Sequence, residues 1–214
     1  MDRRTFLAGA AVLAATGLLP GAAHAQSAAR PLPAPRTDGG MPLMKALAER
    51  RSSRSFAPRE LGEQELSDIL WAAFGVNRGD GRRTAPSARN FQEIDVYAVM
   101  AAGAYRYDAQ GHALVPVADQ DIRELAGSQA FAASAPLNLV YAADYERIGA
   151  AESEKERYAA WDTGFISQNV YLVCAALGLA TVVRASIDRP RLAAALGLVP
   201  RQHITLAQSI GHPG

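Results

Sequence analysis

Two short segments of this chain carry side chains that could bind an anion and the polar edge of a ring. The first, residues 50–56, reads RRSSRSF and holds three arginines within five positions. A guanidinium group binds phosphate through two parallel hydrogen bonds, whereas a lysine supplies only a point charge. Alternation in an extended segment directs Arg50, Ser52 and Arg54 to one side. The segment therefore indicates an anion site, and the alternative is a solvated basic helix end.

The second segment, residues 85–93, reads APSARNFQE and combines a turn of small and amide residues with the start of a strand. Ser87 and Asn90 supply a hydroxyl and an amide, which both donate and accept hydrogen bonds. A heterocyclic ring whose edge alternates donors and acceptors needs partners of this kind. We therefore interpret this segment as a ring-binding turn.

Helices are predicted on both sides of these segments. Apolar residues recur at helical spacing across residues 63–76, which predicts an amphipathic helix. A shorter helix over residues 42–51 is expected to turn Leu43, Ala46 and Leu47 inward. This shorter helix would deliver the arginines of residues 50–54 at its C-terminal end.

The longest predicted helix covers residues 158–177 and is apolar nearly all round towards its end, so we expect it to be buried. Gly178 is expected to end it in the left-handed conformation. A run of charged residues precedes it and is typical of a solvated helix start. The remaining predicted elements are strands at 94–100, 137–142, 180–184 and 204–210, a hairpin at 104–117 around the turn at 108–111, and a helix at 188–196.

These elements predict an α+β domain, in which helices surround a small, mostly antiparallel sheet. The chain shows no repeated strand–helix–strand rhythm and no glycine-rich phosphate loop after a strand, so a doubly wound fold is not expected. Trp71 and Trp161 are interpreted as core residues. Cys174 lies in an apolar stretch and is interpreted as a buried structural thiol rather than a nucleophile.

The first residues of the chain have the order of an export signal. Arg3 and Arg4 form a twin-arginine opening, an apolar run follows, and residues 23–25 read AHA, a small-residue cleavage pattern. The apolar run is too short for a membrane span. We expect export to the bacterial periplasm and a new N-terminus at Gln26; the alternative is an uncleaved amphipathic helix. The predicted organisation is a twin-arginine signal peptide at 1–25, a flexible tether at 26–41 and one domain at 42–214.

Composition narrows the classes of partner. The chain has 22 basic and 21 acidic residues, so it has no electrostatic footprint for nucleic acid or for an anionic membrane. We expect no stable membrane insertion after signal cleavage. One cysteine excludes an intramolecular disulfide, and the scattered histidines have no metal-ligand spacing. Ser87 has no visible histidine and carboxylate partners, so a hydrolase is not favoured.

Four patterns in chain order resemble the nitroreductase-like family of FMN enzymes. Residues 50–56 match an R-x-S-x-R-x-F pattern, and residues 86–92 match P-S-x-x-N-x-Q. Residues 175–181 resemble the family's later A-x-x-L-G-L segment, and residues 207–213 resemble its closing strand and G-[YH]-P. Together the patterns span the chain from about residue 43 to its end, and their order makes the resemblance specific.

The resemblance implies FMN as the cofactor and an intertwined homodimer with the flavin at its interface. It places the ribityl phosphate at the arginine segment, the isoalloxazine at the ring-binding turn and the flavin ring near the backbone of residues 179–181. It implies hydride transfer through flavin N5 to or from a small organic substrate, such as a nitroaromatic compound or a quinone, with no catalytic side chain required. The residues that it assigns to cofactor binding are Arg50, Arg51, Ser52, Arg54, Pro86, Ser87, Ala88, Asn90, Leu179, Ala180 and Thr181.

Two features leave alternatives open. Many members of the family carry basic phosphate-binding residues after the closing strand, whereas this sequence ends at Gly214; Arg184 or Arg89 could compensate. Export would also separate the protein from NAD(P)H, the donor common in the family. The alternative function is a non-catalytic flavin-binding or electron-carrier protein of the periplasm, and a weaker one is a relative that no longer binds FMN.

Overall fold

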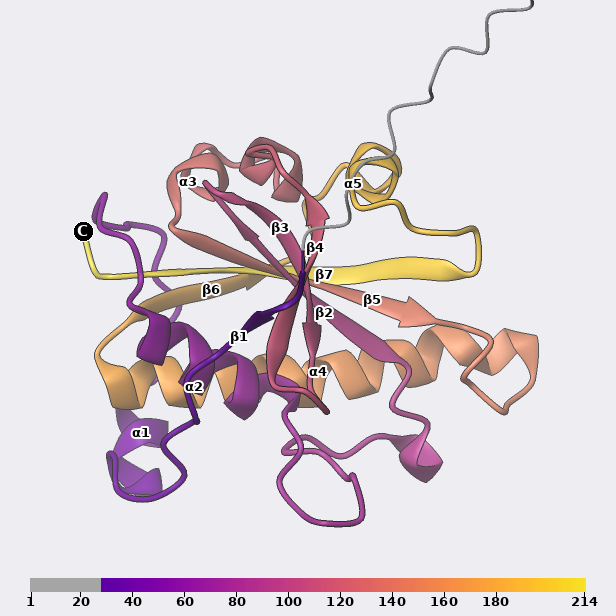
Figure 1. Cartoon of the computed structure of the whole chain (residues 1–214), viewed down its shortest axis with the longest axis horizontal. Helices are drawn as coiled ribbons and strands as arrows, with labels where there is room; N and C mark the ends of the chain where they lie inside the picture. Colours follow the sequence, from indigo (N-terminus) through magenta and orange to yellow (C-terminus); the bar gives the residue numbers. More distant parts are fainter. Residues whose placement is uncertain (1–27) are drawn as a thin grey trace, which may run out of the picture.

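A computed structural model describes residues 28–214, and the predictions for the signal peptide lie outside these residues. Figure 1 shows one twisted sheet with helices on both of its faces. In the described part of the chain the sheet has seven strands in the order β1-β4-β3-β2-β5-β7-β6, and all neighbouring strands are antiparallel. The strands are β1 Arg30–Pro31, β2 Ile94–Met100, β3 Gly103–Asp108, β4 Ala113–Ala118, β5 Leu137–Asp144, β6 Ala180–Arg184 and β7 Gln202–Gly211.

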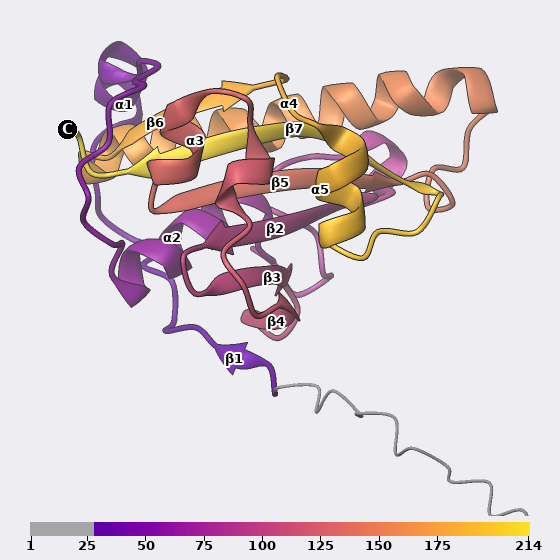
Figure 2. The same ribbon diagram turned by 90° about the horizontal axis from the view of Figure 1, so that it is seen from above.

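Figure 2 shows the same layers from above, with the long helix α4 running beside the sheet. Helices α1, α2 and α4 lie on one face of the sheet, and α3 and α5 lie on the other (Figure 1). Among residues 28–214 no helix combines the length and the apolar character needed to cross a membrane. The helices are α1 Leu43–Glu49, α2 Glu63–Phe74, α3 Ala130–Ser134, α4 Glu152–Leu177 and α5 Arg189–Ala195, with short 3₁₀ turns η1 Ala88–Asn90 and η2 Arg123–Ala126.

The central strands are buried on both faces. In β2, Val96 and Ala98 face the core beneath α2 and α4, whereas Tyr97 and Val99 face the core beneath η2 and α5. All eight residues of β5 are buried. Two covered faces explain why these strands form nearly continuous apolar runs instead of alternating with polar residues. The predicted α+β class and antiparallel sheet are confirmed.

Helix α4 ends where the sequence predicts. Gly178 has φ 69°, in the left-handed region, and its N–H donates to Ala175 O while the N–H of Leu179 donates to Cys174 O. Glycine adopts this conformation without the steric penalty of a Cβ atom. The turn leads directly into β6, so the C-terminal end of α4 lies beside residues 179–181.

Several expected core residues are exposed. In α1 only Ala46 is buried, and Leu43 and Leu47 are 62% and 45% exposed, because this two-turn helix presents a narrow face to α4. Trp161, expected in the core, is 53% exposed. It shares with Phe165 the face of α4 that points away from the sheet, so α4 is not buried all round.

The described part of the predicted tether lies along the domain, unlike the free segment expected from its composition. Arg30 pairs with Leu114 of β4 in register, and Leu32 is buried. The guanidinium group of Arg36 lies 2.6 Å from a carboxylate oxygen of the buried Asp68. Backbone pairing and this ion pair fix residues 30–36, which hydrophobic periodicity alone does not detect.

Candidate active site

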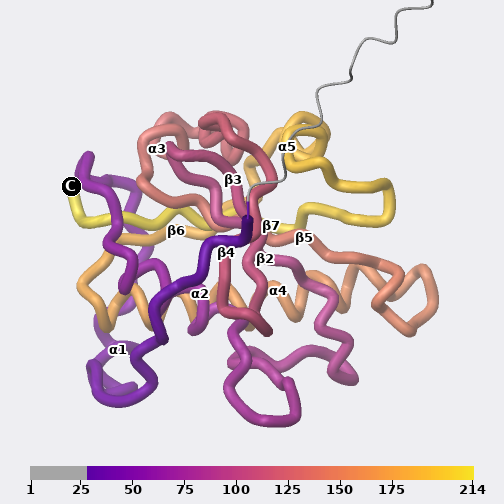
Figure 3. The backbone as a smooth tube through the Cα atoms, viewed as in Figure 1, coloured from indigo at the N-terminus to yellow at the C-terminus, as the bar shows by residue number. Residues whose placement is uncertain are grey.

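A cleft of about 500 Å³ opens where the end of α1, the end of α4 and the start of β6 meet. Figure 3 shows these three elements together near the C-terminus of the chain. The cleft brings the arginine segment together with the late segment that the sequence analysis assigned to the flavin ring. Its lining consists of Ala48, Glu49, Arg50, Arg51, Ser53, Tyr171, Ala175, Gly178, Leu179, Ala180, Thr181 and Pro213.

Tyr171 of α4 organises one wall of this cleft. The guanidinium carbon of Arg50 lies 5.3 Å from the centre of the Tyr171 ring, which is within the range of a cation–π contact. The Tyr171 hydroxyl lies 2.8 Å from Ser52 Oγ and accepts a hydrogen bond of 3.0 Å from the N–H of Val183. One tyrosine therefore joins the arginine segment to β6.

Backbone hydrogen bonds attach the arginine segment to the edge of the sheet. The N–H of Ser53 donates to Thr181 O at 2.9 Å, and the N–H of Ala57 donates to His212 O at 3.0 Å. A β-bridge joins Phe56 to Pro213. The segment is consequently held in place by β6 and by the residues after β7, although it lies far from both in sequence.

Buried polar side chains lie behind the cleft. Thr181 Oγ1 donates to Ser209 O and accepts from Gln208 Nε2, and Gln208 Oε1 accepts from the Tyr141 hydroxyl at 2.7 Å. These partners satisfy groups that burial would otherwise leave without hydrogen bonds. Cys174 is buried here, and burial raises the pKa of its thiol to about 12, which confirms its interpretation as a structural residue.

The guanidinium groups of this segment have no carboxylate partner among the described residues. Ion pairs within residues 28–214 do not include Arg50, Arg51 or Arg54. Strict alternation is not seen, because residues 50–55 are irregular rather than a continuous strand. Arg50, Arg51 and Ser53 line the cleft, Ser52 turns its hydroxyl to Tyr171, and Arg54 lies outside the lining.

The ring-binding turn is a separate structure held by its own hydrogen bonds. The N–H of Asn90 donates to Ser87 O, and the N–H of Gln92 donates to Ser87 Oγ at 3.0 Å. The N–H of Ala88 donates to Asp162 Oδ2 of α4 at 2.8 Å. Arg89, Asn90 and Gln92 have φ of 48°, 59° and 50°, so the turn uses the left-handed region three times without glycine.

Within one chain the turn and the cleft are far apart. The turn is attached to α4 at Asp162, and the cleft is attached to α4 at Tyr171. Nine residues of α-helix separate these positions by roughly 13 Å along the axis. Figure 3 shows the two segments towards opposite ends of α4. The lining of the cleft therefore contains no residue of the turn from its own chain.

Neither arginine considered as a substitute phosphate ligand lines the cleft. Arg184 points to the other face of the sheet, where it donates to Asn138 Oδ1 at 2.6 Å, and burial lowers its pKa to about 10. Arg89 donates to Gly149 O at 3.3 Å, near the turn.

A larger cleft of about 740 Å³ lies between α4, α5 and β7, but it suits an anion poorly. Glu152 and Glu156 contribute negative charge to its lining. Its arginine, Arg189, already donates to Ile204 O and Thr205 O at 2.9 Å each. The smaller cleft with Arg50 and Arg51 is therefore the better anion site.

Comparison with known proteins agrees with this fold. A sequence model of the nitroreductase family matches residues 47–212. A Methanocaldococcus jannaschii protein assigned as a nitroreductase is 36% identical over 151 residues, which cover 65% of this chain and 76% of the relative. The chain therefore belongs to the nitroreductase family, and it is an oxidoreductase.

Two solved structures show the same architecture. The crystal structure of a protein from Ralstonia eutropha, also assigned as a nitroreductase, has a TM-score of 0.84 and 40% sequence identity, covering 92% of this chain and 96% of its own. The NADPH:FMN oxidoreductase from Vibrio harveyi has a TM-score of 0.62 and 21% identity, covering 80% of this chain and 68% of its own. At that identity the second likeness concerns the fold alone.

Sequence reasoning missed three residues of these sites. Tyr171 occupies one position in a long apolar helix, and no local pattern marks its role. Asp162 had a detectable signal, because it lies between Ala159 and Ile166 on the buried face of α4. Glu93 had a similar signal, since a carboxylate directly precedes the buried strand β2.

Proposed function

We propose that this protein is an FMN-dependent oxidoreductase that transfers a hydride through flavin N5 to or from a small organic molecule. Family membership supports a flavin, and one relative of the same fold is named as an NADPH:FMN oxidoreductase. When bound, the flavin supplies the redox chemistry, and the protein supplies binding, orientation and exclusion of water. No side chain is assigned a catalytic role.

The donor groups of the cleft fit the phosphate end of FMN. Arg50 and Arg51 bring two unpaired guanidinium groups to a concave site, which is the charge that a phosphate needs. Ser52 and Arg54 are the other members of the proposed phosphate-binding set and come from the same segment, although neither lines the cleft in one chain. The backbone of Leu179, Ala180 and Thr181 forms the opposite wall, where a flat ring could lie against main-chain groups.

A second copy of the chain would complete the site. In this proposal the turn of Pro86, Ser87, Ala88 and Asn90 reaches the flavin of a partner subunit, because the turn does not line the cleft of its own chain. The exposed apolar residues Trp161 and Phe165 lie on the outer face of α4, with Trp161 next to Asp162 and Phe165 between Asp162 and Tyr171. Gly164 leaves open space beside them for a close approach.

The symmetry of such a contact would bring the half-sites together. If two α4 helices pack antiparallel about a twofold axis near Phe165, the start of one helix lies beside the end of the other. The turn at Asp162 then approaches the partner's cleft at Tyr171, and the reverse holds for the second site. An isologous interface always produces two equivalent sites in this way.

The observation that carries the proposal is the presence of unpaired arginines in a concave site of a nitroreductase-family chain. We would test it by recording the visible absorption spectrum of the purified full chain after gel filtration. We expect a yellow protein with one FMN per chain. A protein that stays colourless after incubation with FMN would contradict the cofactor assignment.

Turnover with small substrates tests whether the protein transfers a hydride to or from a small organic molecule. The flavin-loaded protein would be mixed with NADH, NADPH or reduced viologen as donor, and with a nitroaromatic compound or a quinone as acceptor. We expect multiple turnovers with at least one donor and acceptor pair. Reduction of the flavin without turnover of any acceptor in the panel would instead favour an electron carrier.

A further inference from the structure

Glu93 lies at the base of the ring-binding turn and has an unusual environment. Its side chain is completely buried, and within residues 28–214 no other residue donates a hydrogen bond to either carboxyl oxygen. Its backbone carbonyl accepts from the N–H of Asp144, which fixes the residue at the start of β2. A buried carboxylate without donors is strongly unfavourable, so the observed arrangement requires an explanation.

The nearest explanation is a second buried carboxyl group. Asp162 of α4 is 2% exposed, and its carboxyl group lies beside that of Glu93. Two ionised carboxylates cannot donate to each other, whereas a protonated one donates to an ionised one. A single proton between them gives one oxygen of Glu93 a hydrogen-bond partner and leaves Asp162 Oδ2 to accept from the N–H of Ala88.

The other charged groups around the pair do not remove the need for this proton. Arg147 attracts Glu93, but its guanidinium group is already engaged by Asp95 at 2.6 Å and by Asp144 at 3.6 Å. Arg147 also donates to Gln92 O at 3.1 Å, so it supports the end of the turn.

The remaining ionisable side chains of the turn and its neighbours point elsewhere. Arg83 donates to Gln92 Oε1 at 2.8 Å, and Arg89 donates to the Gly149 carbonyl. Tyr158 of α4 packs edge-on against the ring of Phe91. Asp162 is therefore the side chain of α4 that fixes the backbone of the turn from its buried side.

We propose that Glu93 and Asp162 share one proton and that this carboxyl pair positions the left-handed turn of residues 88–92 for FMN. The positioning role rests on the proposed function, whereas the shared proton does not. Asp162 would act through the Ala88 N–H, and Glu93 would act through Asp162. Both are positioning residues, and neither needs to touch the flavin.

The direction of titration agrees with this geometry. Burial, followed by the negative charge of Asp162, raises the pKa of Glu93 to about 7 from an ordinary value of 4.5. The folded protein therefore binds this proton more tightly than the unfolded chain does. Stability from the pair is complete below about pH 4.5 and declines as the pH rises towards 7.

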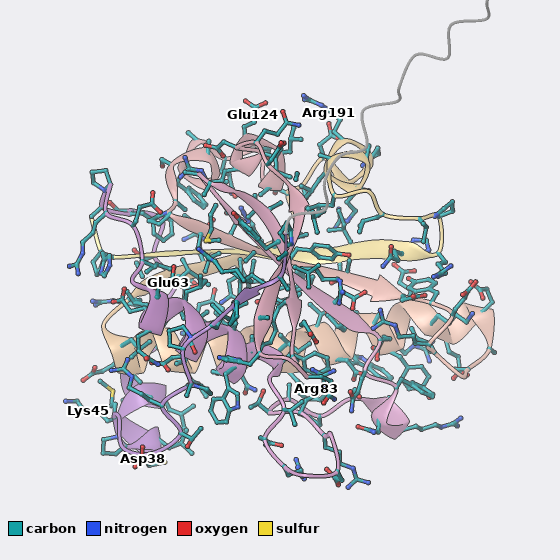
Figure 4. The ribbon with its side chains drawn as sticks, in the orientation of Figure 1. Asp38, Lys45, Glu63, Arg83, Glu124 and Arg191 are labelled. Atoms are coloured by element: carbon teal, nitrogen blue, oxygen red, sulfur yellow. The ribbon has the colours of Figure 1, made fainter. Side chains whose placement is uncertain are left out.

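The test compares the full chain with Glu93→Gln, which resembles the protonated side chain and can donate to Asp162. Infrared spectra at pH 6 should show the carbonyl band of a protonated carboxyl group in the wild type and not in the variant. The melting temperature of the wild type should fall between pH 5 and pH 8, and that fall should be much smaller in Glu93→Gln. Glu124→Gln is the matched control, since Glu124 is exposed and Figure 4 shows it on the other side of the molecule from Arg83.

Measurements of FMN binding then test the positioning role separately from the shared proton. Asp162→Ala removes the anchor of Ala88 and should raise the FMN dissociation constant by roughly tenfold or more. Asp162→Asn keeps an acceptor for that N–H and should bind FMN nearly as the wild type does, while changing the pH dependence of melting. This second variant remains informative if Asp162→Ala does not fold.

Each outcome has a defined meaning. If the wild type shows no carboxyl band that is lost in Glu93→Gln, the shared-proton assignment is wrong. This conclusion holds whether or not FMN binds. A band and pH-dependent melting without any FMN binding would contradict the proposed function and the positioning role together, leaving the proton assignment intact. Equal FMN affinity in the wild type and Asp162→Ala would overturn the positioning role alone.

Discussion

Arg50 is the residue through which the proposed phosphate contact is tested most directly. It lines the cleft, stacks on Tyr171 and has no carboxylate partner among the described residues. Arg50→Ala removes a charge-assisted contact worth about 1.5–3 kcal/mol, so the FMN dissociation constant should rise roughly ten- to 150-fold. Fluorescence titration of flavin-free protein would measure it.

Arg191 provides the control for this substitution. It is an exposed arginine of α5, and Figure 4 shows it on the other side of the sheet from α1. Arg191→Ala should leave FMN affinity unchanged. Equal losses in the two variants would attribute the effect to overall charge and contradict a phosphate contact at Arg50.

Cys174 permits a prediction about reactivity. Burial raises the pKa of its thiol to about 12, so almost none of it is thiolate near neutral pH, and the thiolate is the reactive form. We expect no alkylation by iodoacetamide at pH 8 in the folded protein and complete alkylation in denaturant, as measured by mass spectrometry. Rapid alkylation of the folded protein would show that the region behind the cleft opens.

The sequence predicted which residue types form the cleft better than it predicted the direction in which each side chain points. Arginines and serines at residues 50–54 indicated an anion site, but the side that each one faces depends on contacts with Tyr171 and Thr181, which are more than 100 positions away. Glu93 and Asp162 escaped notice for the same reason. Each is an isolated acidic residue until folding places the two together.

At the scale of elements, helix α4 connects the proposed cofactor site to the proposed dimer. Phe165 is 48% exposed on its outer face, close to Trp161. Phe165→Arg places a charge at the centre of the proposed interface and should convert a dimer to a monomer that retains little FMN. Light scattering after gel filtration, with the flavin absorbance recorded on the same sample, would measure both effects.

Val199→Arg is the matched control for this interface. Val199 is also an exposed apolar residue, but it lies in the loop between α5 and β7. This variant should remain a dimer with bound FMN. A Phe165→Arg protein that stays dimeric and yellow would refute the antiparallel α4 contact.

The reliability of the predicted elements followed the strength of their local signals. Strands β2 and β6 have the predicted bounds, because each is a run of apolar and β-branched residues, with Glu93 before β2 and Arg184 at the end of β6. Helix α4 begins at Glu152, six residues before the predicted start, since a charged first turn has no apolar stripe. Helix α3 was missed because its five residues, four with small side chains and one phenylalanine, form too short a pattern.

At the scale of the whole molecule, we propose that the chain is exported through its twin-arginine signal and works in the periplasm. Replacing Arg3 and Arg4 with lysines should retain the protein in the cytoplasm, because the receptor recognises the arginine pair. Cell fractionation followed by mass spectrometry would measure location and the N-terminal residue, expected to be Gln26 in exported protein. Equal periplasmic amounts of both forms would contradict this route.

The order of the strands gives this molecule two functionally different edges. Strand β1 brings the chain into the sheet beside β4 at one edge, and β6 borders the proposed cofactor cleft at the other. Residues 28 and 29, which lead into β1, therefore lie at the edge of the sheet remote from the cleft. In the proposed route, an export receptor binds the signal peptide and FMN binds in the cleft. Because β1 and the cleft lie at opposite edges of the sheet, the receptor and FMN would not compete for the same surface.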